Sequence, residues 1–203
     1  VIKSIAFDLS GNQIAVASVP NRYETRPDGA AVQSMDDTWT DCAKTLRDHG
    51  DKVENHAART AAVAVTGQGD GTWLIDRNNR PVTEAWLWLD ARAAPVVERE
   101  RGSDADRERF RITGAGLNAC QMGTQLAHMK DTTPELVAAA DAALHCKDWL
   151  YLNLTGKRAT GPCEAVFTFG DFRTRAYDDR VIEALGLMPE KRLLPEIIDG
   201  SQI

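Results

Sequence analysis

The chain has 203 residues, of which 43% are hydrophobic and 27% are charged, and its formal net charge is −6. This composition is typical of a globular protein with one large domain or two small ones. The negative charge disfavours nucleic acid and anionic membranes as partners, and no apolar run is long enough to predict a membrane span. A small neutral ligand agrees with all of these properties.

The N-terminal sequence VIKSIAFDLSG lacks the apolar core and the cleavage site of a signal peptide. The four cysteines, none of them in a C-x-x-C pair, are Cys42, Cys120, Cys146 and Cys163. We therefore expect reduced thiols and a cytoplasmic protein. The four histidines are His49, His56, His128 and His145. Their spacing is not that of metal ligands, so we expect no metal site.

The first part of the chain predicts two strands, a loop and a helix. The segment IKSIAFDLSGNQIAVASVP alternates as two strands around a tight turn at residues 10–12. Residues 21–33 are polar and predict a loop. Ser34 is a candidate N-cap for an amphipathic helix that ends at Gly50. The apolar face of that helix is expected to hold Trp39, Cys42, Ala43 and Leu46.

The next elements are shorter. The segment ARTAAVAVTG (58–67) predicts a strand that is covered on both faces. Residues 73–76 predict another strand, which turns at Asn78-Asn79 and returns at Pro81-Val82, and AWLWLD (85–90) predicts one more. From Ala91 onward the pattern is mostly helical. The expected helices cover 94–101, 105–112, 123–130, 134–140, 148–154 and 178–185.

The stretch TGQGDG (66–71) has glycines at three alternate positions. It is not a dinucleotide fingerprint, which needs G-x-G-x-x-G leading from a strand into a helix, and no Lys-Ser or Lys-Thr follows it as in a phosphate-binding loop. Two interpretations stay open. Either the glycines end a strand and let a ligand approach the backbone, with Gln68 and Asp70 as polar partners, or the stretch is a solvated turn.

Five segments, in this order, resemble the FGGY family of carbohydrate kinases. They are TGQGDG, WLDAR (88–92), TGAGLNACQMGTQLAHMKDTTPEL, HCKDWLYLNLTG and CEAVFTFGDFRTRAYDDRVIEALGL. The resemblance implies an actin-like ribonuclease-H fold. Residues 1–203 would form the N-terminal, sugar-binding domain of a two-domain kinase, with a mixed, mostly parallel sheet flanked by helices. Residues 67–70 would then end a strand and face a cleft.

The same resemblance implies that parts of the kinase lie outside these residues. The family's first strand and its phosphate loop would precede Val1, and the catalytic aspartate and the nucleotide-binding domain would follow Ile203. We therefore expect an unpaired strand edge in this domain and no activity from these residues alone. ATP and Mg²⁺ are the expected cofactors, bound mostly outside this chain.

The implied reaction transfers the γ-phosphoryl group of ATP to a primary hydroxyl of a small sugar alcohol, with erythritol as the first candidate. A ketopentose of the xylulose type and glycerol are alternative substrates. A non-catalytic actin-like binding module is the alternative of another class, which the two motifs around residues 68–70 and 88–92 disfavour. The oligomeric state is left open, a homodimer included.

The resemblance also implies a set of substrate-binding residues. They are Gln68, Gly69, Asp70, Trp88, Asp90, Arg92, Cys120 and Gln121. Asp70 is the strongest candidate, because a carboxylate can accept hydrogen bonds from adjacent hydroxyls and charge-assisted bonds are the stronger kind. Gln68 lines the same site or braces the strand end, and Trp88 forms either an apolar wall or part of the core.

Asp90 and Arg92 share one face if the strand is extended. We expect one of them to reach the substrate or to form an ion pair behind it; in the alternative, Asp90 begins a helix and Arg92 is solvated. Cys120 is expected to fill space rather than to act as a nucleophile, because nothing nearby would lower the pKa of its thiol. The pair Lys147-Asp148 is expected to cap the following helix.

Overall fold

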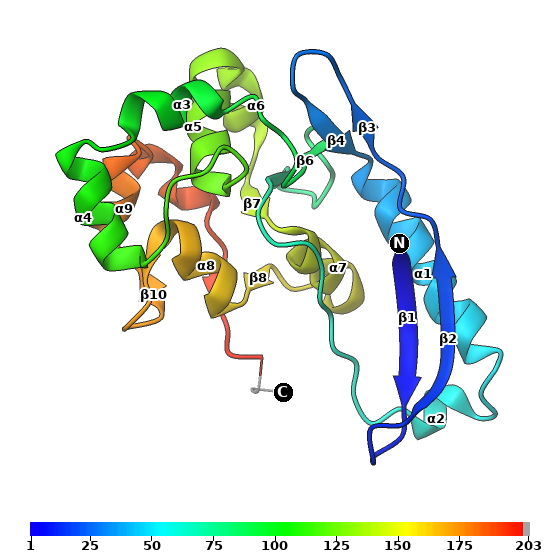
Figure 1. Cartoon of the computed structure of the whole chain (residues 1–203). Helices are drawn as coiled ribbons and strands as arrows, with labels where there is room; N and C mark the ends of the chain where they lie inside the picture. The colour runs from blue at the N-terminus through cyan, green and yellow to red at the C-terminus, as the bar shows by residue number, and fades with distance from the viewer. Residues whose placement is uncertain (201–203) are drawn as a thin grey trace.

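The chain begins with a long antiparallel hairpin in the computed structural model, which describes residues 1–200 (Figure 1). β1 (Ile2–Phe7) pairs with β2 (Gln13–Val19) as predicted, and Gly11 turns the chain with a φ of 84°. The Asp8 carboxylate accepts hydrogen bonds from the backbone N–H groups of Ser10 and Asn12, which holds the turn. The end of the expected domain, 201–203, lies outside the described residues.

Helix α1 (Met35–Gly50) lies along this hairpin and contacts both strands. The predicted cap is confirmed, because the Ser34 hydroxyl accepts a hydrogen bond from the backbone N–H of Asp37. The buried face differs from the predicted one, whose four apolar residues are only partly buried. The fully buried residues are Met35, Thr38, Thr45 and His49. Thr45 bonds to Ser4 of β1 at 2.7 Å, so hydroxyl groups as well as apolar groups join the helix to the hairpin.

The strand predicted over 58–67 is wrong. A short helix, α2 (His56–Arg59), is followed by an extended chain without strand pairing as far as Gly71, and Val63 in this segment is 62% exposed. Small apolar residues alone do not make a strand, because a strand needs a hydrogen-bonded neighbour. β1 pairs with β2 alone among the described strands, so its other edge is unpaired, as expected.

The segment predicted as a loop, 21–33, contains two short strands. β3 (Glu24–Thr25) and β4 (Ala31–Gln33) form a second hairpin, and β6 (Ala85–Trp86) pairs with the free edge of β4. Residues 30–33 are buried although their neighbours are polar. This hairpin therefore brings the N-terminal end of α1 close to the tryptophan-rich segment.

The centre of the molecule is β5 (Trp73–Ile75), which pairs with β7 (Ala142–Leu144) in antiparallel register. Successive side chains of a strand point to opposite faces, so β5 divides the core into two parts. Leu74 packs with Leu126, Met129 and the C-terminal helices, whereas Trp73 packs on the other side with Trp149. The turn that follows β5 contains Asn79 at a φ of 61°, as the sequence predicts.

The expectation of a mostly parallel sheet is wrong. The described strands form five separate sheets of two or three strands, and the one parallel pair among them joins β8 (Ala159–Thr160) to β11 (Glu196–Ile197). The physical reason lies in the unpaired segment 60–70. Because it forms no ladder, nothing connects the N-terminal hairpin with β5.

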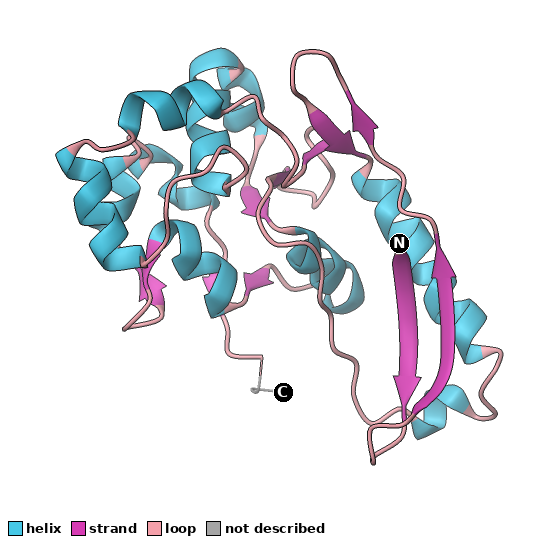
Figure 2. Ribbon diagram, viewed as in Figure 1, coloured by secondary structure: helices cyan, strands magenta, loops and turns pink. Residues whose placement is uncertain are grey.

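Most helices after β6 gather on one side of the central strands, whereas α1 and the helix that carries Trp149 lie on the other (Figures 1 and 2). The six predicted helices are confirmed as α3 (Ala94–Glu100), α4 (Asp104–Thr113), α5 (Met122–Thr132), α6 (Pro134–Ala139), α7 (Cys146–Thr155) and α9 (Asp179–Ala184). The pattern did not predict α8 (Pro162–Phe169), the short hairpin β9 (Gly170–Asp171) and β10 (Ala176–Tyr177), or the 3₁₀ helix η1 (Met188–Leu193). Helix α5 is buried along most of its length and forms the middle of the helical layer.

Candidate functional site

The glycine-rich loop, residues 67–71, contacts two helix starts and one strand that lie far apart in the sequence. A Cβ at Gly67 would lie 3.2 Å from the Cys146 Sγ atom, and one at Gly69 would lie 3.3 Å from both carboxylate oxygens of Glu164. A Cβ at Gly71 would lie only 2.5 Å from the backbone oxygen of Trp86. Each of the three glycines therefore leaves room for a different neighbour, because it has no side chain.

Asp70 lies within this loop in a left-handed conformation, with a φ of 58°. Asp and Asn adopt this conformation more readily than most residues, but it still strains the backbone. The next residue, Gly71, donates a hydrogen bond from its N–H to the Cys120 carbonyl at 2.8 Å, which fixes the loop on the segment before α5. The strain at Asp70 is thus held by the packing on both sides of it.

The Asp70 carboxylate is partly buried and has one hydrogen-bond donor, the Cys120 thiol, at 3.5 Å. Burial raises the pKa of Asp70 above its usual range; the Cys120 hydrogen bond opposes this shift, and the nearby Glu164 charge adds to it. Burial and the Asp70 charge also raise the pKa of the Cys120 thiol to about 11. Cys120 is therefore protonated at neutral pH and is not an activated nucleophile, in line with the expectation.

Gln68 connects the loop to the start of α1. Its Nε2 donates a hydrogen bond to the Gln33 Oε1 atom at 3.4 Å, and the pKa of the Cys146 thiol is raised by burial and lowered in part by Gln68. Gln33 is 3% exposed and is itself held by Asn21 and Thr38. This network supports the bracing alternative for Gln68.

Trp88 is 51% exposed, so the core-packing alternative for it is excluded. The buried residue of this motif is Trp86, which is 5% exposed. The Arg92 guanidinium stacks on the Trp86 ring at 3.4 Å from the ring centre. Trp88 is left with an open indole face that a ligand can cover.

Asp90 is 1% exposed and fully hydrogen-bonded within the protein. It accepts hydrogen bonds from the backbone N–H groups of Ala31 and Arg92 and from the Arg92 guanidinium at 2.7 Å. The expected ion pair between Asp90 and Arg92 is therefore present. It joins the tryptophan-rich segment to β4, and the alternative of a solvated Arg92 is wrong, because this side chain is only 19% exposed.

Gln121 is 0% exposed, and its amide closes the loop before α5. Its Nε2 donates a hydrogen bond to the Gly116 carbonyl at 2.9 Å, and its Oε1 accepts one from the Asn118 backbone N–H. The loop holds Cys120 beside Asp70. Gln121 thus affects the site indirectly, because its hydrogen bonds fix the backbone that carries Cys120.

The start of α7 confirms the capping prediction. Asp148 accepts hydrogen bonds from the His145 backbone N–H at 3.0 Å and from the Lys147 ammonium at 2.7 Å. Burial acts to raise the pKa of this carboxyl, but the His145 hydrogen bond and the charges of His145 and Lys147 outweigh it and hold the pKa below its usual range. Both carboxylate oxygens of Asp148 accept hydrogen bonds within this cap, as the sequence predicts.

The sequence does not predict two of the residues beside the loop, Gln33 and Glu164. Gln33 falls in a segment that predicts a loop, and Glu164 falls in a helix that the apolar pattern did not predict. A start signal for that helix does exist, because Pro162 at its first position and an acid in its first turn are typical of a helix N-terminus. No local pattern predicts that Glu164 touches Gly69, since 95 positions separate them.

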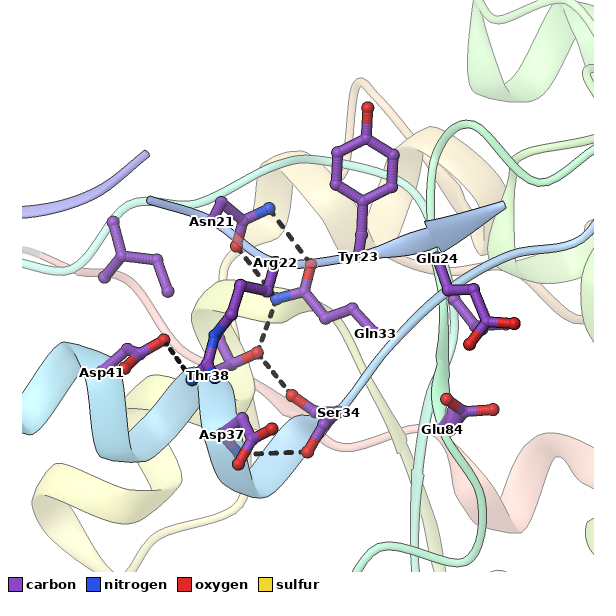
Figure 3. A pocket seen from close by; sticks show the side chains of 12 residues that line it. Asn21, Arg22, Tyr23, Glu24, Gln33, Ser34, Asp37, Thr38, Asp41 and Glu84 are labelled. Atoms are coloured by element: carbon purple, nitrogen blue, oxygen red, sulfur yellow. Dashed lines mark hydrogen bonds and ion pairs between the residues drawn. The ribbon is translucent and has the colours of Figure 1, made fainter. Parts of the chain in front are cut away.

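A cavity of about 190 Å³ opens between β3, β4 and the start of α1 (Figure 3). Gln33 and Thr38 form its inner wall, and Asp41 and Glu84 lie at its rim. No residue of the glycine-rich loop lines it. The loop meets it through the hydrogen bond between Gln68 and Gln33, so the expected cleft at residues 67–70 is not this cavity.

Comparison with known proteins decides the family. The model of the N-terminal domain of the FGGY family of carbohydrate kinases matches residues 1–203. The chain belongs to this family. It is 63% identical over 202 residues, 100% of the chain, to the erythritol kinase of Brucella abortus (strain 2308), and 30% identical over 208 residues, 99% of the chain, to the xylulose kinase of Streptomyces rubiginosus.

The fold of this FGGY domain agrees with a solved structure. A crystal structure described as a "xyloylose kinase" from Brucella ovis superposes with a TM-score of 0.89 at 20% identity, over 98% of this chain and 40% of that one. The expected actin-like ribonuclease-H fold class is thereby confirmed. The chain spans 39% of the length of the Brucella abortus relative and 41% of the Streptomyces one.

Among residues 1–200, no group of three or more His, Cys, Asp or Glu side chains is placed to hold a metal ion. No helix in the same range is both long and apolar enough to cross a bilayer. The four cysteines are free thiols.

Proposed function

We propose that this FGGY domain is the substrate-binding part of an ATP-dependent kinase that phosphorylates a primary hydroxyl of a small sugar alcohol, with erythritol as the first candidate. The observation that carries the proposal is the 63% identity to the Brucella abortus erythritol kinase over the whole chain. The geometry supports it, because Asp70 presents a carboxylate with one weak protein donor. A ligand made only of hydroxyl groups offers the donors that this carboxylate lacks.

In this proposal the residues of the loop bind and orient the substrate. Asp70 accepts hydrogen bonds from substrate hydroxyls, and the open face of Trp88 packs on the C–H groups of the polyol. Gly69 leaves the backbone accessible, and Gln68 holds the loop in place from the side of Gln33. Such catalysis consists mostly of positioning, because the chemistry of phosphoryl transfer needs a fixed acceptor oxygen.

The other proposed binding residues act from behind the loop. Asp90 and Arg92 fix the segment that carries Trp88, and Gln121 fixes Cys120. These residues stabilise the shape of the site. We assign them to positioning, since the donors and acceptors of Asp90 and Gln121 are already paired within the protein.

ATP supplies the phosphoryl group in this proposal, and Mg²⁺ would neutralise its charge. The described residues do not fit a metal site, so we assign neither cofactor to a residue of this chain. The catalytic aspartate and the nucleotide domain belong, in the same proposal, to residues after Ile203. The free thiols agree with a cytoplasmic enzyme.

The test measures ATP-dependent phosphorylation by the full-length enzyme with erythritol, glycerol and a ketopentose of the xylulose type. We expect the highest kcat/KM with erythritol. The 203-residue chain, assayed in parallel, should give no turnover above a blank. A higher kcat/KM with the ketopentose would replace erythritol by the substrate class of the Streptomyces relative, and turnover by the chain alone would show that its catalytic parts are wrongly assigned.

A further inference from the structure

A second carboxylate, that of Glu164, lies against the glycine-rich loop. It stands in the first turn of α8, and both of its oxygens approach the Gly69 backbone to within 3.3 Å of where a Cβ would be. A side chain at position 69 would make this carboxylate shift by a few tenths of an ångström. Glu164 can therefore lie against the loop because Gly69 has no side chain.

Glu164 is partly buried and has no protein partner among residues 1–200: no group there donates a hydrogen bond to it, and no Lys, Arg or His forms an ion pair with it. The first-turn acid of the neighbouring helix α7 differs, because Asp148 is paired with His145 and Lys147. The Glu164 carboxylate therefore keeps its acceptor capacity unused within the protein. A ligand that brings hydroxyl donors can fill it.

Asp70 and Glu164 lie close enough for the charge of one to act on the other. No cation is hydrogen-bonded to either carboxylate among the described residues. Cys120 is a neutral thiol, the Lys147 ammonium is bonded to Asp148, and His145, which is also bonded to Asp148, acts on the pKa of Asp70 only through its charge. The loop therefore presents two acceptor groups whose remaining capacity a ligand can fill.

We infer that Glu164 is a second substrate-binding residue: its carboxylate accepts hydrogen bonds from the hydroxyls of the sugar alcohol, and together with Asp70 it excludes sugar acids. The inference rests on the proposed function and adds a basis for specificity to it. A neutral polyol supplies a hydroxyl donor to each carboxylate. An aldonate, which has a carboxylate of its own, meets two like charges and is repelled.

The experiment uses the full-length enzyme and the variant Glu164→Gln, with erythritol as substrate and erythronate, the four-carbon aldonate, as inhibitor. We expect kcat/KM for erythritol to fall about ten- to hundredfold, mostly through KM, because a charged acceptor is lost. The inhibition constant of erythronate should fall at least about tenfold, because one repelling charge is removed. A purely structural role of Glu164 would not strengthen the binding of an anion.

Glu135→Gln is the matched control. Glu135 also stands in the first turn of a short helix that begins with a proline, α6, but it is exposed and away from the loop. Both constants should stay at the wild-type values. Gly69→Ala is the second variant, and its methyl group would shift the Glu164 carboxylate by a few tenths of an ångström. We expect kcat/KM for erythritol to fall in this variant and the inhibition constant of erythronate to stay near the wild-type value, because both charges are kept.

Calorimetric binding of erythritol to the wild type and to Glu164→Gln separates this inference from the proposed function. If the wild type binds and phosphorylates erythritol and Glu164→Gln has unchanged constants for both compounds, the inference is overturned and the proposed function stands. If the wild type neither binds nor phosphorylates a polyol, both are overturned. If Glu164→Gln does not fold, an unchanged kcat/KM for erythritol in Gly69→Ala overturns the inference.

Discussion

Two aspartates lie at either end of the same glycine- and tryptophan-rich stretch, and their surroundings are opposite. Asp90 is 1% exposed and accepts hydrogen bonds from two backbone N–H groups and a guanidinium. Asp70 is partly exposed, adopts a left-handed backbone conformation and accepts one hydrogen bond from a thiol. A carboxylate whose acceptor capacity is used within the protein holds structure together. One whose capacity is unused, in a strained and close-packed loop, is available to a ligand.

Removing Asp90 should have the largest effect on stability. Asp90→Ala would leave the Arg92 guanidinium and the Ala31 N–H without their acceptor. Breaking a buried pair costs about 3–5 kcal/mol, and we expect the lower end, because Arg92 reaches solvent. The free energy of unfolding should be measured by denaturant titration, followed by tryptophan fluorescence.

Asp104→Ala is the control for Asp90→Ala. Asp104 also forms an ion pair, with Arg107, but its side chain is 98% exposed. An exposed pair contributes about 0–1 kcal/mol, so the two variants should differ by several-fold in their effect. Equal losses in the two variants would contradict a structural role for Asp90.

Asp70, the other aspartate of this stretch, is tested by its effect on activity. Asp70→Asn keeps the size of the side chain but replaces an acceptor-only group by a mixed donor and acceptor. A bound hydroxyl would lose a charged partner worth about 1.5–3 kcal/mol, so kcat/KM for erythritol should fall about ten- to hundredfold in the full-length enzyme. Asp70→His should reduce kcat/KM for erythritol more than for a ketopentose. Steady-state kinetics of both variants give the answer, and unchanged values with every substrate would place Asp70 outside the site.

The two aspartates also show how far the sequence carries the prediction. Six helices, the first hairpin and the Ser34 cap follow from local patterns of apolar residues and capping groups, and the structure confirms them. The strand expected over 58–67 failed because strand formation depends on a neighbour that the pattern does not contain. The same limit applies to β3 and β4, which pair across a polar segment.

The site was predictable in its residue types and not in its contacts. The pairing of Asp90 with Arg92 was expected, but not for the predicted reason: the strand predicted over 85–90 ends at Trp86, and a turn follows it. The contact of Gly69 with Glu164 joins distant segments and follows only from the packing of α8. Trp86 and Trp88 are alike in sequence, and only the structure shows that the first is buried and the second exposed. Local rules thus identify candidate side chains, and the tertiary packing decides which of them stay free for a ligand.

Asp70 should also make the stability of the fold depend on pH. Burial is the main reason why the pKa of Asp70 is raised in the folded state above the value of about 3.9 for an exposed aspartate. The folded protein therefore binds this proton more tightly than the unfolded chain does. Asp70 contributes stability below the usual aspartate pKa, and this contribution is lost as the pH rises through the raised pKa.

At neutral pH the wild type consequently carries an unfavourable charge in the loop, which Asp70→Asn removes. We expect the variant to have a slightly higher Tm than the wild type at pH 7, and the difference should shrink as the pH falls towards 4. The effect is small because Asp70 is partly exposed and solvent screens its charge. Thermal unfolding of the two proteins across this range measures it. A variant that is less stable than the wild type at pH 7 would show that Asp70, like Asp90, holds the structure together, and the distinction between the two aspartates would then be lost.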